Sequence, residues 1–185
     1  GSHKKVVNKG KDPKSTVNIM IYGDTKYDAK EAFALKALGE VLTIKLVEEL
    51  RENESGVYGV GARGSMNKVP YGSYNFSISF PCGPENAEKL TESALRELNK
   101  MITNGPEQKD LDKFKEASRL EYKESLKDNR YWMAVLKRQY TDGVNPEEVF
   151  EFEAKLNALT IKELQDVAKK YLSKDKVIGI LIPEE

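Results

Sequence analysis

Residues 37 to 64 read "ALGEVLTIKLVEELRENESGVYGVGARG", and the hydrophobic pattern of this stretch changes half-way along it. Up to Leu50 the apolar residues recur every three or four positions, which predicts a long helix with a wide apolar face. Arg51 stands on the last turn of that helix, and Asn53 to Gly56 end it. From Val57 to Ala62 the pattern favours a strand. The stretch therefore predicts a helix that leads directly into a sheet.

The rest of the chain predicts an α+β fold. Residues 73 to 80 alternate serine or asparagine with aromatic and aliphatic side chains, which indicates a sheet that is apolar on one face and wet on the other. We expect a small mixed or antiparallel sheet of about four strands, with the helices packed on one face. The expected order is β-α-β-β-α-α-α-α-α-β, with strands near 16–22, 57–62, 73–80 and 177–182, and helices near 28–50, 84–101, 107–127, 129–140, just before 159, and 160–171.

The length of the chain predicts its domain organisation. A chain of 185 residues can bury one sizeable core, and is too short for two ordinary domains without a visible linker. We expect a single domain over residues 16–185. Residues 4–15 are rich in lysine and read as an entry linker, and Gly1-Ser2-His3 reads as the scar of a cleaved affinity tag.

The composition excludes several classes of function. The 30 basic and 30 acidic residues cancel, so the chain lacks the positive field that favours nucleic acid as a partner. No apolar run approaches the roughly 18 to 20 residues that span a bilayer. The lone Cys82 leaves the cellular compartment open. Since His3 is the only histidine, we expect no metal site and no cofactor in this segment.

The tail of the opening stretch, residues 59–64, spells a literal G-x-G-x-x-G. In a dinucleotide-binding fold these glycines follow a strand and open a helix, so that the pyrophosphate meets the helix N-terminus. Here the order is reversed, because the glycines follow a helix and lie in a strand. We therefore interpret them as marking the close approach of another backbone or helix. A nucleotide-binding module stays as an alternative that a thermal-shift measurement with NAD or ATP would test.

Arg51 and Tyr58 allow two interpretations. In the first, Arg51 bonds the last carbonyls of its helix, and Tyr58 packs its ring and finds one partner for its hydroxyl. In the second, the helix end and the following strand present a fixed cation and a neutral phenol on one surface. Such a pair can hold peptide carbonyls and stabilise an oxyanion. The local pattern by itself favours the structural interpretation.

Residues 37–64 resemble the non-catalytic half of the pitrilysin and insulin-degrading (M16) family of zinc metallopeptidases. In that family a long helix delivers an arginine, and the next strand delivers a tyrosine seven residues later. Further stretches agree in order, among them "SFPCGPENAEKL" (79–90), "NGPEQKDLDKFKEASRLEYKESLKDNRYWMAVL" (104–136), "LNALTIKELQDVAKKYL" (156–172) and the closing "VIGILIPEE". The resemblance covers roughly residues 15 to 185.

The resemblance implies a division of labour between two halves. The zinc is expected in an N-terminal half that carries H-x-x-E-H, on the same chain or on a separate subunit, and this segment lacks that motif. By analogy Tyr58 donates to the substrate carbonyl that becomes an oxyanion, and Arg51 orients the peptide substrate beside it. The segment alone is expected to cleave nothing. The alternative is a catalytically inactive scaffold or assembly subunit of the same fold.

Overall fold

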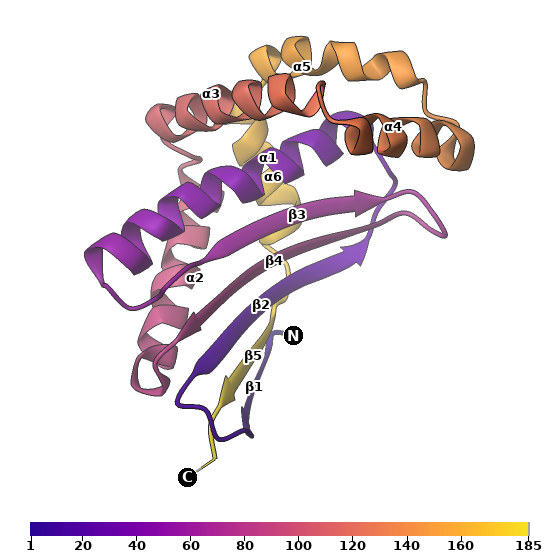
Figure 1. The fold of residues 1–185 in the computed structure, drawn as a ribbon. Helices are drawn as coiled ribbons and strands as arrows, with labels where there is room; N and C mark the ends of the chain where they lie inside the picture. Colours follow the sequence, from indigo (N-terminus) through magenta and orange to yellow (C-terminus); the bar gives the residue numbers. More distant parts are fainter. Residues whose placement is uncertain (185) are drawn as a thin grey trace.

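The computed structural model describes residues 1–184, and its centre is a five-stranded mixed sheet (Figure 1). The strands lie in the order β1-β5-β2-β4-β3. β1 pairs parallel with β5, and every other neighbouring pair is antiparallel. Their bounds are β1 His3–Asn8, β2 Ser15–Asp24, β3 Gly61–Asn67, β4 Ser73–Cys82 and β5 Val177–Ile182.

Six α-helices lie within the described residues, and three of them cover one face of the sheet. α1, α2 and α6 pack on that face, whereas α3, α4 and α5 lie along the outer side of α1 (Figure 1). The bounds are α1 Ala29–Leu46, α2 Ala87–Thr103, α3 Gln108–Ser125, α4 Asn129–Asp142, α5 Phe152–Ala158 and α6 Ile161–Leu172. Short η1 (Val47–Asn53), η2 (Pro84–Asn86) and η3 (Pro146–Glu151) continue or precede them.

The core lies between the sheet and these helices. Along β2 and β4 the buried side chains alternate with exposed or half-buried ones, so each strand turns one row towards the helices. Leu35, Leu38 and Leu42 of α1 are fully buried against that row. The α+β fold, the helices on one face and the wet opposite face are confirmed.

Local signals place several helix ends correctly. The Asp28 carboxylate accepts a hydrogen bond of 2.8 Å from the Glu31 amide and caps α1. Thr160 and Glu163 form a reciprocal capping box at the start of α6. Gly105 ends the α2 region with φ +76°, a backbone conformation that favours glycine.

Two expectations about the strands are corrected. The sheet has five strands rather than about four, because β1 forms from residues that were expected to be the end of a tag scar and an entry linker. All six of its side chains are exposed, so no hydrophobic alternation marks it in the sequence. The second expected strand, 57–62, begins later, at Gly61, since residues up to Asn53 continue the helix as a π-helical turn. Val57 keeps only an isolated bridge to Cys82.

The G-x-G-x-x-G lies under α1, and one of its glycines is needed there. A Cβ on Gly64 would stand 2.2 Å from the Leu35 carbonyl oxygen, and a Cβ on Gly39 would stand 2.8 Å from the Gly64 amide nitrogen. The Thr43 hydroxyl accepts a hydrogen bond of 2.8 Å from the Ala62 amide at the edge of the sheet. Gly64 therefore marks a close helix approach, as the sequence indicated, whereas a Cβ on Gly59 or Gly61 would meet open space.

Candidate functional site

Arg51 lies in the last turn of η1 and points away from the core. In η1 the helix widens: the Glu54 amide donates to the Glu49 carbonyl and the Gly56 amide to the Leu50 carbonyl, each at 3.0 Å. Leu50 is fully buried, and the Arg51 side chain is more than half exposed. Among residues 1–184 its recorded polar contact is an ion pair of 3.5 Å with Glu52, and no bond to a carbonyl of its own helix is present. The guanidinium therefore stays available to another molecule.

Tyr58 is exposed in the connection between η1 and β3. Val57 is buried and bridges to Cys82, whose side chain faces the helices. The Tyr58 side chain is 89% exposed. Of the two interpretations of Tyr58, the one in which it packs its ring does not fit this exposure.

Arg51, in the last turn of η1, and Tyr58, in the connection that follows η1, are both exposed. No hydrogen bond joins the two side chains in the described part of the chain. They can act as two separate contacts. Arg51 offers a cationic guanidinium that only donates hydrogen bonds, and Tyr58 offers a phenol that donates one hydrogen bond. Neither is sealed in the core, and neither is used to stabilise it.

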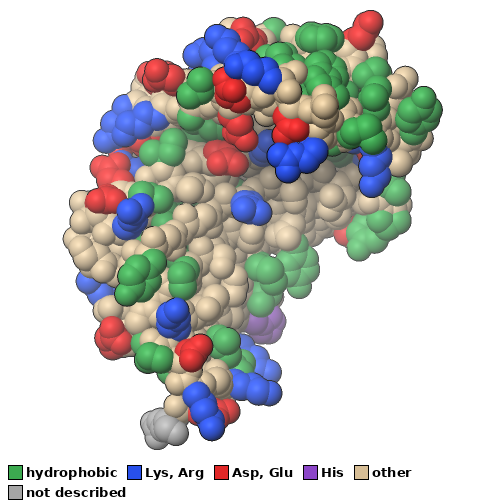
Figure 2. Space-filling view, in the orientation of Figure 1, with side chains coloured by type: hydrophobic (Ala, Val, Ile, Leu, Met, Phe, Trp, Pro, Cys, Tyr) green, Lys and Arg blue, Asp and Glu red, His purple; other side chains and the backbone are tan. Residues whose placement is uncertain are grey.

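The sheet face that the helices leave open carries one row of small, uncharged side chains. The register brings Asn18 beside both Ser79 and Gly179, and Ser79 beside Gly61, in one row across four strands. Figure 2 shows this as a field of backbone and uncharged polar groups over the strands in the middle of the view. Such a surface leaves room for a polypeptide and presents peptide-like hydrogen-bonding groups.

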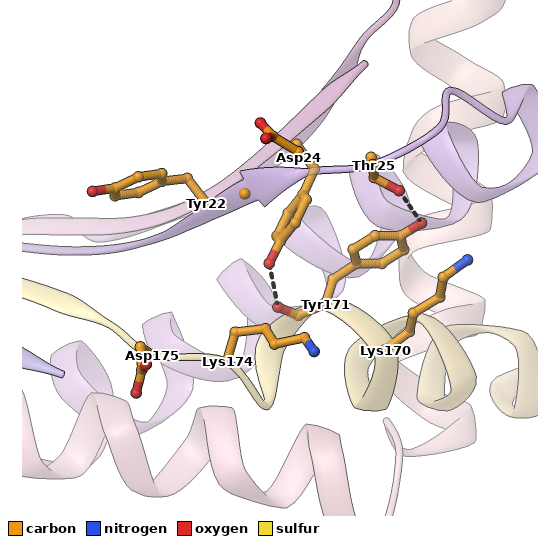
Figure 3. A pocket seen from close by; sticks show the side chains of 9 residues that line it. Tyr22, Asp24, Thr25, Lys170, Tyr171, Lys174 and Asp175 are labelled. Atoms are coloured by element: carbon orange, nitrogen blue, oxygen red, sulfur yellow. Dashed lines mark hydrogen bonds between the residues drawn. The ribbon is translucent and has the colours of Figure 1, made fainter. Parts of the chain in front are cut away.

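A pocket of about 460 Å³ lies at the opposite end of β2, between that strand and the end of α6 (Figure 3). Two of its charged lining residues, Lys170 and Asp175, are paired within the chain. The Lys170 ammonium donates to Glu31 at 2.6 Å, and Asp175 meets the N-terminal amine at 3.1 Å. Burial, with Tyr171 beside it, raises the pKa of Tyr74, whose hydroxyl donates to the Tyr171 carbonyl. Arg51 and Tyr58 are not part of this pocket, so we do not assign the site to it.

The residues of this chain do not fit a zinc ion. Within residues 1–184 no group of three histidine, cysteine, aspartate or glutamate side chains is arranged to hold a metal. His3 is exposed on β1, and Cys82 is buried. Burial, with Glu85 nearby, raises the pKa of the Cys82 thiol and so disfavours the thiolate that binds metals. None of the helices in the described part is long and apolar enough to cross a bilayer.

Comparison with known families identifies the family of this chain. The family model of the peptidase M16 inactive domain matches residues 1–118, well over half of the chain and the whole region that carries Arg51 and Tyr58. The chain belongs to the peptidase M16 inactive-domain family. Its relatives include a probable zinc protease PqqL of Haemophilus influenzae, 23% identical over 177 residues, which cover 95% of this chain and 19% of that protein.

Solved structures show the same M16 fold. The periplasmic protease PqqL from Escherichia coli matches with a TM-score of 0.80 at 21% identity, over 99% of this chain and 21% of that one. A peptidase M16 inactive domain from Pseudomonas fluorescens matches with a TM-score of 0.77 at 19% identity, over 100% of this chain and 44% of that one. The chain thus spans about a fifth of the curated relative's length.

Proposed function

We propose that this M16 inactive domain forms part of the peptide-binding chamber of a zinc metalloendopeptidase, with Arg51 and Tyr58 as its contacts to the substrate. The zinc and the H-x-x-E-H motif belong in this proposal to a partner half, on the same chain or a separate subunit. That division suits a chain whose residues do not fit zinc and whose relatives are described as zinc proteases of several times its length.

The observation that carries the proposal is the exposure of Tyr58. A tyrosine normally buries most of its ring, because the ring provides a large apolar area. Tyr58 is 89% exposed although its neighbour Val57 is buried. Its hydroxyl is free to donate to the oxygen of a peptide carbonyl, and that bond strengthens as negative charge develops on the oxygen. Tyr58 would therefore stabilise the transition state more than the bound substrate.

Arg51 has a different role in the proposal. Its guanidinium has several N–H donors in one plane. Arg51 stands seven residues before Tyr58 in the sequence. We propose that it donates to carbonyl oxygens of the substrate backbone next to the scissile bond and sets the register of the peptide. This contact exists in the ground state as well, so it would contribute mainly to KM.

The test is Tyr58→Phe in the complete protein, with the zinc-bearing half present. Loss of one oxyanion donor typically lowers turnover by about 10²- to 10³-fold. We expect a fall in kcat of that order and little change in KM, measured with a fluorogenic peptide. Tyr140→Phe is the matched control, because Tyr140 is 87% exposed on α4 and lies outside the proposed site. An unchanged kcat for Tyr58→Phe would contradict the role of Tyr58.

The scaffold alternative makes the opposite prediction for the parent protein. If the complete polypeptide or its neighbouring reading frame contains no H-x-x-E-H, and the assembly cleaves no peptide, the fold serves assembly rather than proteolysis. An upstream H-x-x-E-H together with chelator-sensitive cleavage supports the peptidase.

A further inference from the structure

One buried carboxylate, that of Glu54, ties the segment between Arg51 and Tyr58 to helix α2. Glu54 comes directly after η1 and is 12% exposed, and both of its carboxylate oxygens are closed to solvent. The Lys89 ammonium lies 3.0 Å from one oxygen, and the Arg96 guanidinium lies 3.8 Å from the other. Both cations belong to α2, so the carboxylate joins two elements that are far apart in the sequence.

The charge state of Glu54 makes this connection specific. Burial by itself raises the pKa of a carboxyl group, but Ser93, Lys89 and Arg96 offset this effect, and the pKa of Glu54 lies below its ordinary value. The group is therefore ionised at neutral pH. An ionised carboxylate that is closed to solvent is stable only beside its cations, so Glu54 must stay where α2 presents them.

The residues that follow Glu54 are constrained against the same helix. A Cβ on Gly56 would stand 2.7 Å from the Leu90 side chain of α2, so only glycine fits there without a shift. Ser55 has φ +49°, in the left-handed region, which turns the chain sharply between the two. Val57 then bridges to Cys82, and the exposed Tyr58 follows it. The path from Glu54 to Tyr58 leaves little freedom.

We propose that Glu54 is a positioning residue: by binding Lys89 and Arg96 of α2 it sets where the Arg51 guanidinium and the Tyr58 hydroxyl stand relative to a bound peptide. The inference rests on the proposed function of those two residues. Glu54 lies three residues after Arg51 and four before Tyr58, and its ion pairs are with α2 rather than with either of them. It acts through the backbone, and α2 is the rigid support.

Kinetics of the complete protein test this role. Glu54→Gln keeps the shape of the side chain and removes its charge, and we expect kcat to fall roughly ten- to a hundredfold, because a displacement of about 1 Å in a positioned group has effects of that size. In a Tyr58→Phe background the same change should lower kcat much less, since no hydroxyl is left to misplace. An equal fall in both backgrounds indicates a general structural effect and overturns the inference.

Two further variants keep the test decisive if Glu54→Gln impairs folding. Lys89 is mostly exposed, so Lys89→Gln removes the closer cation with little risk to folding, and we expect the same direction with a smaller fall in kcat. Glu92→Gln is the matched control, because Glu92 is exposed on the same helix and has no ion pair recorded among residues 1–184. A fall in kcat for Glu92→Gln equal to that for Lys89→Gln contradicts the role.

Amide hydrogen exchange of the complete protein separates this inference from the proposed function. Peptides that cover residues 54–58 should exchange on the order of tenfold faster in Glu54→Gln, and unchanged in Glu92→Gln. If Tyr58→Phe lowers kcat but Glu54→Gln changes neither kcat nor exchange, the positioning role is wrong and the proposed function stands. If Tyr58→Phe keeps full kcat, the proposed function is wrong, whatever the exchange of this segment shows.

Discussion

At the scale of single residues, Lys45 gathers three carboxylates around one ammonium. Glu107 lies 2.7 Å from the Lys45 nitrogen, Glu48 3.4 Å and Asp110 3.8 Å. Lys45, then Lys109, hold the pKa of Glu107 at about 2, below its ordinary value of 4.5. Burial has the opposite effect on Asp110, which is fully buried and whose pKa is raised. The pKa values of these two carboxyl groups, three residues apart, are therefore shifted in opposite directions.

Glu107 should make stability depend on pH. Because its pKa is lower in the folded protein than in the unfolded chain, its contribution is fully present above the unfolded pKa and is lost as pH falls towards 2. The side chain is half exposed, so solvent screens the ion pair and the contribution stays within about 1 kcal/mol. We expect Glu107→Gln to lower the free energy of unfolding by up to that amount at pH 7, in urea titrations, and the difference to shrink between pH 4.5 and 2.

The control for this prediction is Glu116→Gln. Glu116 is exposed on the same helix, α3, and no ion pair of it is recorded in the described chain. We expect Glu116→Gln to match the unsubstituted protein across the range. A Glu107→Gln deficit that is the same at pH 3 as at pH 7 would show that the ion pairs with lysine are not its cause.

At the scale of elements, the decisive contact is that of α1 with β3. β3 is an edge strand, and edges expose unpaired amide groups. α1 covers this edge. The Thr43 hydroxyl accepts a hydrogen bond from the Ala62 amide, and Gly39 and Gly64 let the two backbones approach closely. The same approach fixes α1 on the sheet, and α1 continues directly into η1, which carries Arg51. The glycine motif thus serves packing.

Two glycines of that motif should respond differently to alanine. Gly64→Ala places a methyl group 2.2 Å from a backbone oxygen that cannot move alone, so we expect a loss of about 3 kcal/mol or more in the free energy of unfolding. Gly61→Ala adds a methyl group in open space and should stay within about 0.5 kcal/mol. Thermal and urea unfolding of the two variants give both values.

The comparison of the two variants is the check on this argument. Both substitutions add the same methyl group in the same strand, three residues apart, so propensity alone predicts similar effects. Equal stability of the two variants would mean that the approach of α1 to β3 is not tight.

At the scale of the whole molecule, the two faces of the sheet differ in what they can do. The helices cover one face and supply the core, while the other carries a row of small polar groups across four strands (Figures 1 and 2). This arrangement suits a domain whose open sheet face closes against the other half of a larger protein. The proposed peptidase activity therefore needs both halves.

The isolated chain should show no peptidase activity above background when zinc is added. Its described residues form no metal cluster, and Tyr58 can stabilise an oxyanion but cannot generate a nucleophile. The measurement is hydrolysis of a fluorogenic peptide by the purified chain with and without a chelator. Cleavage by pure material that the chelator abolishes would contradict the proposed division between the halves.

The helices and most of the strands could be predicted from the sequence, because apolar residues repeat at the period of the element that buries them. The caps at Asp28 and Thr160 and the glycine end at Gly105 are local as well, since each needs only neighbours within a few residues. The family resemblance singled out Arg51 and Tyr58, although local patterning by itself favoured a structural role for both.

Tertiary structure alone decided the features that join distant residues. β1 has only exposed side chains, so its pairing with β5, more than 170 residues away, left no periodic trace. The ion pairs of Glu54 with α2 and the exposure of Tyr58 depend in the same way on where α2 and β4 lie. Periodicity reports which side of an element faces the core. It carries no information on which distant backbone or charge that side meets, and this is set only when the whole chain packs.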